Sequence, residues 1–183
     1  MKNQTTIPSL LEQTDRILVI GCAGSGKSTL SIRLGARLGL PVIHLDRIYW
    51  QTGWNPVSNA EFDRRLAEVL DQERWILDGN YSCTFLTRFE ACDAVVYLDF
   101  PRLICLKNVF ARYLRYHGRT RPDLPEGCPE GLDWEFLVWI WNFNKTHRQR
   151  YYDLFGAHEK PVVILHSRRE CDEFLNSLST SPS

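Results

Sequence analysis

Short apolar runs recur along the chain, and the longer segments between them have a helical spacing of apolar residues. The runs are rich in β-branched residues and indicate strands at 16–20, 42–45, 75–77, 94–98 and 162–165. Most positions in these runs are apolar rather than alternating, which predicts strands that are covered on both faces. The expected architecture is therefore a parallel sheet inside an α/β fold.

The segments between these runs carry their apolar residues on one helical face. A leucine recurs at every fourth position from Leu30 to Leu38, until Gly-Leu-Pro at 39–41 ends the pattern. The segments 61–72 and 103–114 are one-sided in the same way. Helices on both faces of the sheet give three layers, and ligands of such folds bind beyond the carboxyl ends of the strands.

The stretch 115–133 interrupts this alternation with three glycines and three prolines, which predicts an irregular excursion. An aromatic-rich helix over roughly 134–155 then returns the chain to the core. The apolar content of 134–143 fits either core packing or a contact between subunits, so monomer and homodimer both stay open. The tails, 1–14 and 177–183, are expected to be flexible.

Length and charge narrow the class of protein. A chain of 183 residues suits one compact domain spanning 1–183. Its 22 basic and 22 acidic side chains cancel, so overall charge gives no reason to expect direct nucleic-acid binding, although 112–121 could form a local basic patch. Because no apolar run is long enough to span a membrane and 1–15 lacks signal-peptide character, a cytoplasmic protein is predicted.

The cysteines do not indicate a metal site or a disulfide framework. None of the six forms a Cys-x-x-Cys pair, and their spacing does not match that of zinc ligands. We expect them to be reduced and mostly buried as small hydrophobic residues.

The most specific motif follows the first predicted strand. Residues 21–29 read Gly-Cys-Ala-Gly-Ser-Gly-Lys-Ser-Thr, a full match to Gly-x4-Gly-Lys-[Ser/Thr] between a strand and a helix. Its glycines allow the backbone to close around a phosphate, Lys27 can reach the β- and γ-phosphates, and the Ser28 hydroxyl can ligate Mg²⁺. A glycine-rich turn without a ligand is the alternative. The residues expected to bind the nucleotide are Gly21, Ala23, Gly24, Ser25, Gly26, Lys27, Ser28 and Thr29.

Three of the predicted strands end in an aspartate. A carboxylate beside a phosphate loop can hold Mg²⁺ or accept a proton from an attacking hydroxyl group. Asp78, which Gly79 follows, is the expected metal residue. Asp46 is the expected residue for the phosphoryl acceptor, with Mg²⁺ contact as a second role, and Asp99 is expected to be structural. Each of the three could instead cap the helix or turn that follows it.

Arginines flank the irregular excursion. Arg112, Arg115 and Arg119 share one helical face, and Arg121 lies just beyond it. Because guanidinium groups stabilise the charge of a transferred phosphoryl group, these positions predict a mobile lid over roughly 112–133. Arg115, Arg119 and Arg121 are the expected catalytic arginines, together with Lys27 and Asp46. A solvated basic face is the alternative.

These segments resemble the adenylate-kinase-like branch of the P-loop nucleoside and nucleotide kinases. The resemblance rests on 21–29, on Trp-Ile-Leu-Asp-Gly at 75–79, on 95–101 and on the arginine-bearing 112–150. Within that branch the chain is most similar to DNA topology modulation (FlaR-related) proteins, through Leu-Asp-Arg-Ile-Tyr-Trp at 45–50, Gly53-Trp54 and Asp-Gly-Asn-Tyr at 78–81, and through 119–123, 127–128 and 135–139.

The resemblance implies a five-stranded P-loop NTPase sheet in the order 2-3-1-4-5, Mg²⁺ and ATP as cofactors, and phosphoryl transfer. For a kinase, Asp46, Arg47 and Arg88 are expected to orient the acceptor, beside Asp78. The chain departs from adenylate kinases after Asp78-Gly79, where Asn-Tyr replaces Phe-Pro-Arg, so the acceptor is left open. Trp54, with Trp50, could stack on a ring of the acceptor or serve only in packing.

Two classes of function follow. The first is a kinase that transfers the γ-phosphoryl group of ATP to a nucleotide or small-molecule acceptor. The second is a nucleotide-dependent regulator of the DNA topology modulation type, whose lid movement is read by DNA or by a protein. A GTPase is not favoured, because the only Asn-Lys pair, at 144–145, is followed by Thr-His and not by the Asn-Lys-x-Asp pattern.

Overall fold

Five parallel strands form the centre of the computed structural model, which describes residues 11–121 and 123–178. The strands are β1 (Arg16–Gly21), β2 (Val42–His44), β5 (Trp75–Asp78), β6 (Ala94–Leu98) and β7 (Val162–Leu165). Their spatial order is β2-β5-β1-β6-β7, which confirms the expected order 2-3-1-4-5. At the centre, Leu18 lies opposite Leu77 on one side and Val95 on the other.

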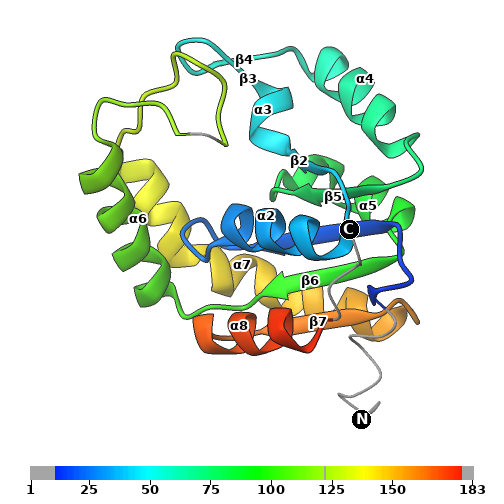
Figure 1. Ribbon diagram of the computed structural model, residues 1–183. Helices are drawn as coiled ribbons and strands as arrows, with labels where there is room; N and C mark the ends of the chain where they lie inside the picture. Colours follow the sequence, from blue (N-terminus) through cyan, green and yellow to red (C-terminus); the bar gives the residue numbers. More distant parts are fainter. Residues whose placement is uncertain (1–10, 122, 179–183) are drawn as a thin grey trace.

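Helices cover both faces of this sheet. Figure 1 shows α2 (Lys27–Leu38) and α8 (Arg168–Ser177) in front of the strands, and α5 (Phe85–Ala91) and α7 (Trp134–Ala157) behind them. The three central strands are covered on both faces. Strand β1 is buried from Ile17 onward, and β5 and β6 are buried over their whole length. The three-layer α/β arrangement predicted from the apolar runs is confirmed.

A small insertion follows β2 on the carboxyl side of the sheet. It consists of α3 (Leu45–Tyr49), the antiparallel hairpin of β3 (Trp50–Gln51) and β4 (Asn55–Pro56), and α4 (Asn59–Leu70). After β5, the short 3-10 helix η1 (Ser82–Thr84) leads into α5. Aromatic rings attach the insertion to the segment that follows β5, since Tyr49 of α3 and Phe62 of α4 both contact the ring of Tyr81.

Two helices flank the predicted lid. The helix α6 (Arg102–Tyr116) precedes it and α7 follows it, and the segment between them includes isolated bridges from His117 to Glu130 and from Thr120 to Pro129. Figure 1 places this segment next to the β3–β4 hairpin, on the side of the sheet where the loop between β1 and α2 also lies. The excursion predicted at 115–133 therefore begins about two residues later than expected.

The two predicted tails are only partly described. The stretches 1–10 and 179–183 lie outside the described residues. Leu11 and Leu178 belong to the two stretches that were expected to be flexible tails, yet both are buried in the core. Their side chains pack among apolar neighbours, which removes them from water. Among the helices of the described chain, none is both long enough and apolar enough to cross a membrane.

Candidate functional site

The loop between β1 and α2 is shaped by glycines that other residues could not replace without strain. Gly21, Gly24 and Gly26 have φ angles of +148°, +79° and +96°. A Cβ atom on Gly24 would lie 2.3 Å from the carbonyl oxygen of Cys105, and one on Gly21 would lie 2.6 Å from that of Leu98. The loop is thus held against both β6 and α6, and its backbone curves in a way that suits phosphate binding.

The start of α2 completes this cradle. Gly26 occupies the N-cap position of the helix, and no side chain caps it. The first N–H groups of a helix have no partner within the helix, and together with the helix dipole they favour an anion at this end. The hydroxyl group of Ser25 is buried in the same loop and has no hydrogen-bond partner among the described residues. These open donors fit the phosphates of a nucleotide.

Lys27 lies over the loop that precedes it. Its Nζ donates a hydrogen bond of 3.1 Å to the carbonyl oxygen of Cys22. Ser28 is half-buried and Thr29 is exposed. The structure therefore places the ammonium group of Lys27 at the mouth of the cradle, and the hydroxyl group of Ser28 lies on the first turn of α2, where the motif expects a Mg²⁺ ligand.

Two asparagines that the sequence analysis did not select support the loop. The side chain of Asn80 accepts a hydrogen bond of 3.3 Å from the backbone N–H of Gly21. The amide group of Asn108, on α6, donates one of 2.8 Å to the carbonyl oxygen of Gly24. Asn80 directly follows the Asp-Gly pair, which was the available signal, whereas nothing in the sequence links Asn108 to a loop 84 residues away.

Asp78 ends β5 next to the loop and is buried. Its carboxylate pairs with Nδ1 of His44 over 2.8 Å, and His44 ends the neighbouring strand β2. Burial lowers the pKa of His44, but the hydrogen bond and the negative charge of Asp78 outweigh it, so this pKa is raised above its usual value. The metal residue predicted at 78 thus has an orienting partner, as metal-binding carboxylates commonly do. Sequence analysis missed His44, which the end of the apolar run at 42–44 could have indicated.

Asp46 lies in the first turn of α3 and is half-buried. The hydroxyl group of Tyr81 donates a hydrogen bond of 2.8 Å to it. Burial raises the pKa of this carboxyl above its usual value, and the negative charge of Asp78 adds to the effect, while Tyr81, Lys27 and Arg121 act in the opposite direction. Through Tyr81, Asp46 contacts the segment 78–81, which also contacts the phosphate loop where Asn80 accepts a hydrogen bond from Gly21.

Arg88 is fully buried in α5 and is turned towards the backbone. Its guanidinium group donates to the carbonyl oxygens of Gly79 (2.9 Å), Asn80 (2.7 Å) and Tyr81 (2.8 Å), and to the hydroxyl group of Thr84 (3.1 Å). Burial lowers its pKa to about 10. Arg88 therefore holds the loop that carries Asp78, Asn80 and Tyr81, and direct contact with an acceptor stays a prediction that this geometry does not favour, because the side chain has no exposed surface.

The arginines of the lid fall into two groups. Arg112 and Arg121 both pair with Glu130, over 2.8 Å and 2.7 Å, and Arg121 also donates to Asp123 over 2.9 Å. Glu130 is buried, and burial lowers the pKa of Arg112. This network joins the end of α6 to the described residues 121, 123 and 130 of the lid, so Arg121 contributes to the structure of the lid.

Arg115 and Arg119 form the second group. Both are exposed, and within the described part of the chain neither pairs with an acidic side chain. Arg115 lies only against the ring of its neighbour Tyr116, 5.4 Å from the centroid. These are the lid arginines whose guanidinium groups are open to an anion.

Trp54 holds the hairpin to the lid. Its indole N–H donates a hydrogen bond of 2.9 Å to the carbonyl oxygen of Pro129, and its ring meets that of Trp50 edge-on at 5.3 Å. Next to it, the backbone N–H of Gly53 donates to the carbonyl oxygen of Gly127 over 2.8 Å. The packing role that the sequence left open for Trp54 is therefore present. Arg47, on α3, is exposed.

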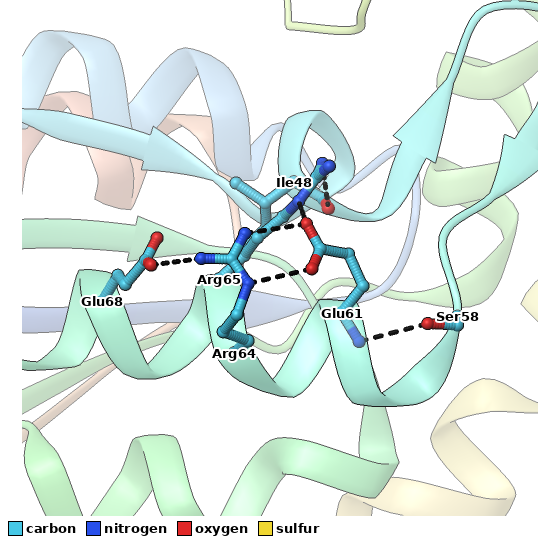
Figure 2. Close-up of polar contacts among 6 residues, drawn as sticks. All are labelled: Ile48, Ser58, Glu61, Arg64, Arg65 and Glu68. Atoms are coloured by element: carbon cyan, nitrogen blue, oxygen red, sulfur yellow. Dashed lines mark hydrogen bonds and ion pairs between the residues drawn. The ribbon is translucent and has the colours of Figure 1, made fainter.

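A network of charges on α4 braces the insertion from the other side (Figure 2). The hydroxyl group of Ser58 caps the helix by accepting from the backbone N–H of Glu61, and Glu61 pairs with both Arg64 and Arg65. Arg65 also reaches the carbonyl oxygen of Ile48 in α3 over 3.4 Å. The hydrogen bonds from Arg64 and Arg65 lower the pKa of Glu61 to about 2. Helix α4 and the helix that carries Asp46 are thus tied together.

Asp99 directly follows β6 and has a structural role, although not as a helix cap. It is buried and accepts hydrogen bonds from Arg148 and Tyr152 of α7, both over 2.9 Å. Helix α6 instead has Pro101 at its N-cap position. This carboxylate joins the sheet to the helix that returns from the lid.

Comparison with known proteins identifies the fold. No family model and no curated protein matches the chain by sequence. The solved structure of a shikimate kinase from Acinetobacter baumannii in complex with shikimate is similar, with a TM-score of 0.57 and 17% identity over 92% of this chain and 93% of that one.

Two further solved structures are similar to this chain. A shikimate kinase from Bacteroides thetaiotaomicron has a TM-score of 0.54 at 16% identity, over 89% of this chain and 95% of the other. A gluconokinase from Sinorhizobium meliloti 1021 has a TM-score of 0.51 at 17% identity, over 88% and 91%. At these identities the likeness establishes the P-loop kinase fold.

Proposed function

We propose that this chain is an ATP-dependent phosphotransferase that acts on a hydroxyl group of a small molecule. The observation that carries the proposal is the position of Asp46: this half-buried carboxylate accepts a hydrogen bond of 2.8 Å from Tyr81, whose neighbour Asn80 accepts one of 3.3 Å from Gly21 in the phosphate loop. A carboxylate beside the γ-phosphate is placed to accept a proton from an attacking hydroxyl group. The solved structures of similar fold, which include shikimate kinases and a gluconokinase, support this class of reaction.

The residues divide the work as follows. The amides of the loop and Lys27 hold the phosphate chain, and Ser28 and Asp78 would hold Mg²⁺. Bound Mg-ATP supplies the phosphoryl group and a cation that offsets its charge. Asp46 takes the proton of the acceptor hydroxyl as its oxygen bonds to the γ-phosphorus, and the bond from that phosphorus to the bridging oxygen breaks to leave ADP.

The lid acts on the charge that develops during this transfer. Arg115 and Arg119, which have open guanidinium groups, are expected to meet the equatorial oxygens of the phosphoryl group when the lid closes. The network of Arg112, Arg121 and Glu130 gives the lid a fixed internal shape. Closure would also exclude water and so favour the acceptor over hydrolysis.

The acceptor side favours a hydroxylated compound over a nucleoside monophosphate. The guanidinium group of Arg88 is occupied by backbone oxygens, and Arg65 is paired with Glu61. The side chain assigned to the acceptor hydroxyl group is a carboxylate, Asp46, which would repel a phosphate. The adenylate-kinase-like acceptor and the relation to DNA topology modulation proteins stay predictions from the sequence.

A screen for ADP release tests the proposal. ADP formation is measured with ATP, Mg²⁺ and a panel of polyols, sugars, hydroxy acids, nucleosides and nucleoside monophosphates. We expect release that depends on a hydroxylated acceptor, and Asp46→Asn should abolish it while ATP still binds. Lys27→Ala should lose ATP binding or turnover, and Asp63→Asn, an exposed aspartate on α4, is the matched control.

The outcomes separate the alternatives. Transfer by Asp46→Asn at the wild-type rate would overturn the role of this residue. ATP binding without ADP release for any acceptor would instead support the nucleotide-dependent regulator. ADP release that only monophosphates stimulate would support the adenylate-kinase-like acceptor.

A further inference from the structure

One face of the molecule exposes an unusual share of its large apolar side chains. Of the ten that lie exposed in the described part of the chain, seven are on α6 and α7. They are Leu103, Ile104, Phe110, Leu114, Trp134, Val138 and Trp141, which we call the α6–α7 face. Isolated apolar residues on a surface are ordinary, but a group of this size on two neighbouring helices indicates a contact surface.

The two helices present this face side by side. Figure 1 shows α6 and the first half of α7 next to each other at one end of the sheet. Near the start of α6, the guanidinium group of Arg102 lies 3.9 Å from the ring centroid of Trp141, and near its end Arg112 pairs with Glu130, just before α7 begins. The helices are therefore antiparallel, and the apolar side chains of both belong to one surface.

The spacing shows that each helix points a stripe away from the core. On α7, Trp134, Val138 and Trp141 are separated by four and three residues, so they share one helical face. The buried residues of that helix, Ile140 and Phe143, lie on another face. Trp141 of this stripe contacts Arg102, and none of the three side chains packs into the hydrophobic core of the described residues.

The area of the α6–α7 face matches what a stable dimer needs. Trp134 is 76% exposed, and Leu103 and Leu114 are each 65% exposed. From the usual areas of such side chains, the seven leave on the order of 700 Å² uncovered, close to the ~800 Å² that each partner buries in a standard interface.

Charges along α7 suggest how a second copy would fit. Glu135 and Lys145 are both exposed and flank the apolar stripe at its two ends. If two α7 helices lie antiparallel across a two-fold axis near Ile140, Glu135 of each copy meets Lys145 of the other. On α6, Arg102 and Lys107 have the same sign, which favours α7 at the centre of the contact and α6 at its rim.

We propose that the α6–α7 face joins two copies of this chain into a symmetric dimer, with the α7 helices antiparallel at its centre. The two-fold arrangement is the commonest for proteins that associate with themselves. With the axis near Ile140, it brings Val138 and Trp141 of the two copies together at the centre and places Trp134 of each copy near Thr146 of the other, at the edge of the contact. The proposal does not depend on the proposed function.

Sedimentation velocity over a range of loading concentrations of the full chain tests the dimer. We expect a dimer that Trp141→Ser weakens roughly 10-fold or more in dissociation constant, because central aromatic residues dominate interface energies, and that Trp134→Ser, at the edge of the contact, weakens less. Ile32→Ser and Leu86→Ser are matched controls, since these side chains are similarly exposed elsewhere, on α2 and α5. They should leave the dissociation constant unchanged.

A monomer at every concentration would overturn the proposal, as would a dimer that the α7 variants do not weaken. Binding of a monomer to vesicles of anionic lipid would do the same and would assign the face to a membrane surface. Circular dichroism of each variant checks that the fold is retained.

Charge reversal tests the antiparallel arrangement separately. Lys145→Glu and Glu135→Lys should each weaken the dimer, since each places like charges opposite one another. The double variant should restore wild-type association, because it exchanges the charges and keeps the pair. Failure of the double variant to recover association would overturn the arrangement.

Discussion

The hydroxyl group of Tyr81 donates a 2.8 Å hydrogen bond to the carboxylate of Asp46, across from the end of β5 to the first turn of α3. Burial raises the pKa of Tyr81, and the charge of Asp46 raises it further, so the phenol stays protonated and remains a donor. The same hydrogen bond opposes the effect of burial on Asp46. Tyr81 therefore helps to keep the proposed base ionised.

Tyr81→Phe should move the acid side of the pH profile to higher pH. Asp46 must be ionised to accept a proton, so activity is lost as the pH falls through its pKa. Without the donor, burial acts unopposed by Tyr81 and raises that pKa further. The profile of kcat/KM against pH measures the shift, and Tyr113→Phe on α6 is the control. An unchanged acid side would mean that Asp46 does not titrate in this profile.

Arg88→Met should destabilise the fold rather than act on catalysis alone. The substitution removes donors from the carbonyl oxygens of Gly79, which is buried, and of Asn80 and Tyr81, which are half-buried. We expect the free energy of unfolding to fall by about 3 kcal/mol. Arg33→Met, which removes an exposed ion pair with Asp172, should cost less than about 1 kcal/mol.

Denaturant unfolding of both variants measures this difference. A stable Arg88→Met variant that had lost only the response to the acceptor would contradict the supporting role. It would instead favour the direct contact predicted from the sequence.

Gly24→Ala should disable the phosphate loop. The new Cβ atom would lie 2.3 Å from the carbonyl oxygen of Cys105, and φ at this position is +79°. The loop or α6 must shift, and the misplaced phosphates should slow ADP release roughly 100-fold. Gly131→Ala is the matched control, because no heavy atom lies within 4 Å of the added Cβ atom. Equal activity of the two variants would argue against a loop in contact with phosphate.

Two lid arginines should give different defects. Arg119→Ala removes an open guanidinium group, so it should lower kcat roughly 100-fold or more and change ATP affinity little. Arg121→Ala breaks contacts with Glu130 and Asp123, and should lower the free energy of unfolding by about 2 kcal/mol. Single-turnover kinetics, ATP titration and denaturant unfolding separate these effects. Equal losses of kcat and ATP affinity in Arg119→Ala would mean that this arginine binds ground-state ATP.

Glu61 should titrate at unusually low pH. Hydrogen bonds from Arg64 first and Arg65 second lower its pKa from 4.5 to about 2. A depressed pKa stabilises the fold above the unfolded value, and this contribution is lost as the pH falls from about 4.5 to about 2. Titration of the carboxyl carbon by NMR measures the midpoint, which Arg64→Met should raise more than Arg65→Met. A midpoint that neither variant moves would contradict the network of Figure 2.

The apolar runs were sufficient to predict much of the architecture. The run at 16–20 became the buried β1, and the excursion after α6 lies where glycines and prolines had accumulated. The phosphate loop was predictable because its signal is local: the glycines, Lys27 and Ser28 all lie within the nine residues 21–29. Asp46 and Asp78 were selected because strand ends meet at one edge of a parallel sheet.

Other contacts could not be predicted, because they join residues far apart in sequence. An arginine near the Asp-Gly pair looks the same in sequence whether it faces a ligand or the backbone, and only the fold turns Arg88 inward. Glu130 gave no sign that it would pair with Arg112 and Arg121. The amide of Asn108 reaches Gly24 only because α6 lies against the loop.

By itself, then, the sequence determined the layered α/β fold, the phosphate loop and the acidic strand ends, since periodicity and turn chemistry act over a few neighbouring residues. Only the tertiary structure decided which charged side chains are already paired and which remain open. Partners such as His44 for Asp78 and Tyr81 for Asp46 are set by how strands and helices pack. That packing results from burial summed over the whole chain, which no local pattern records.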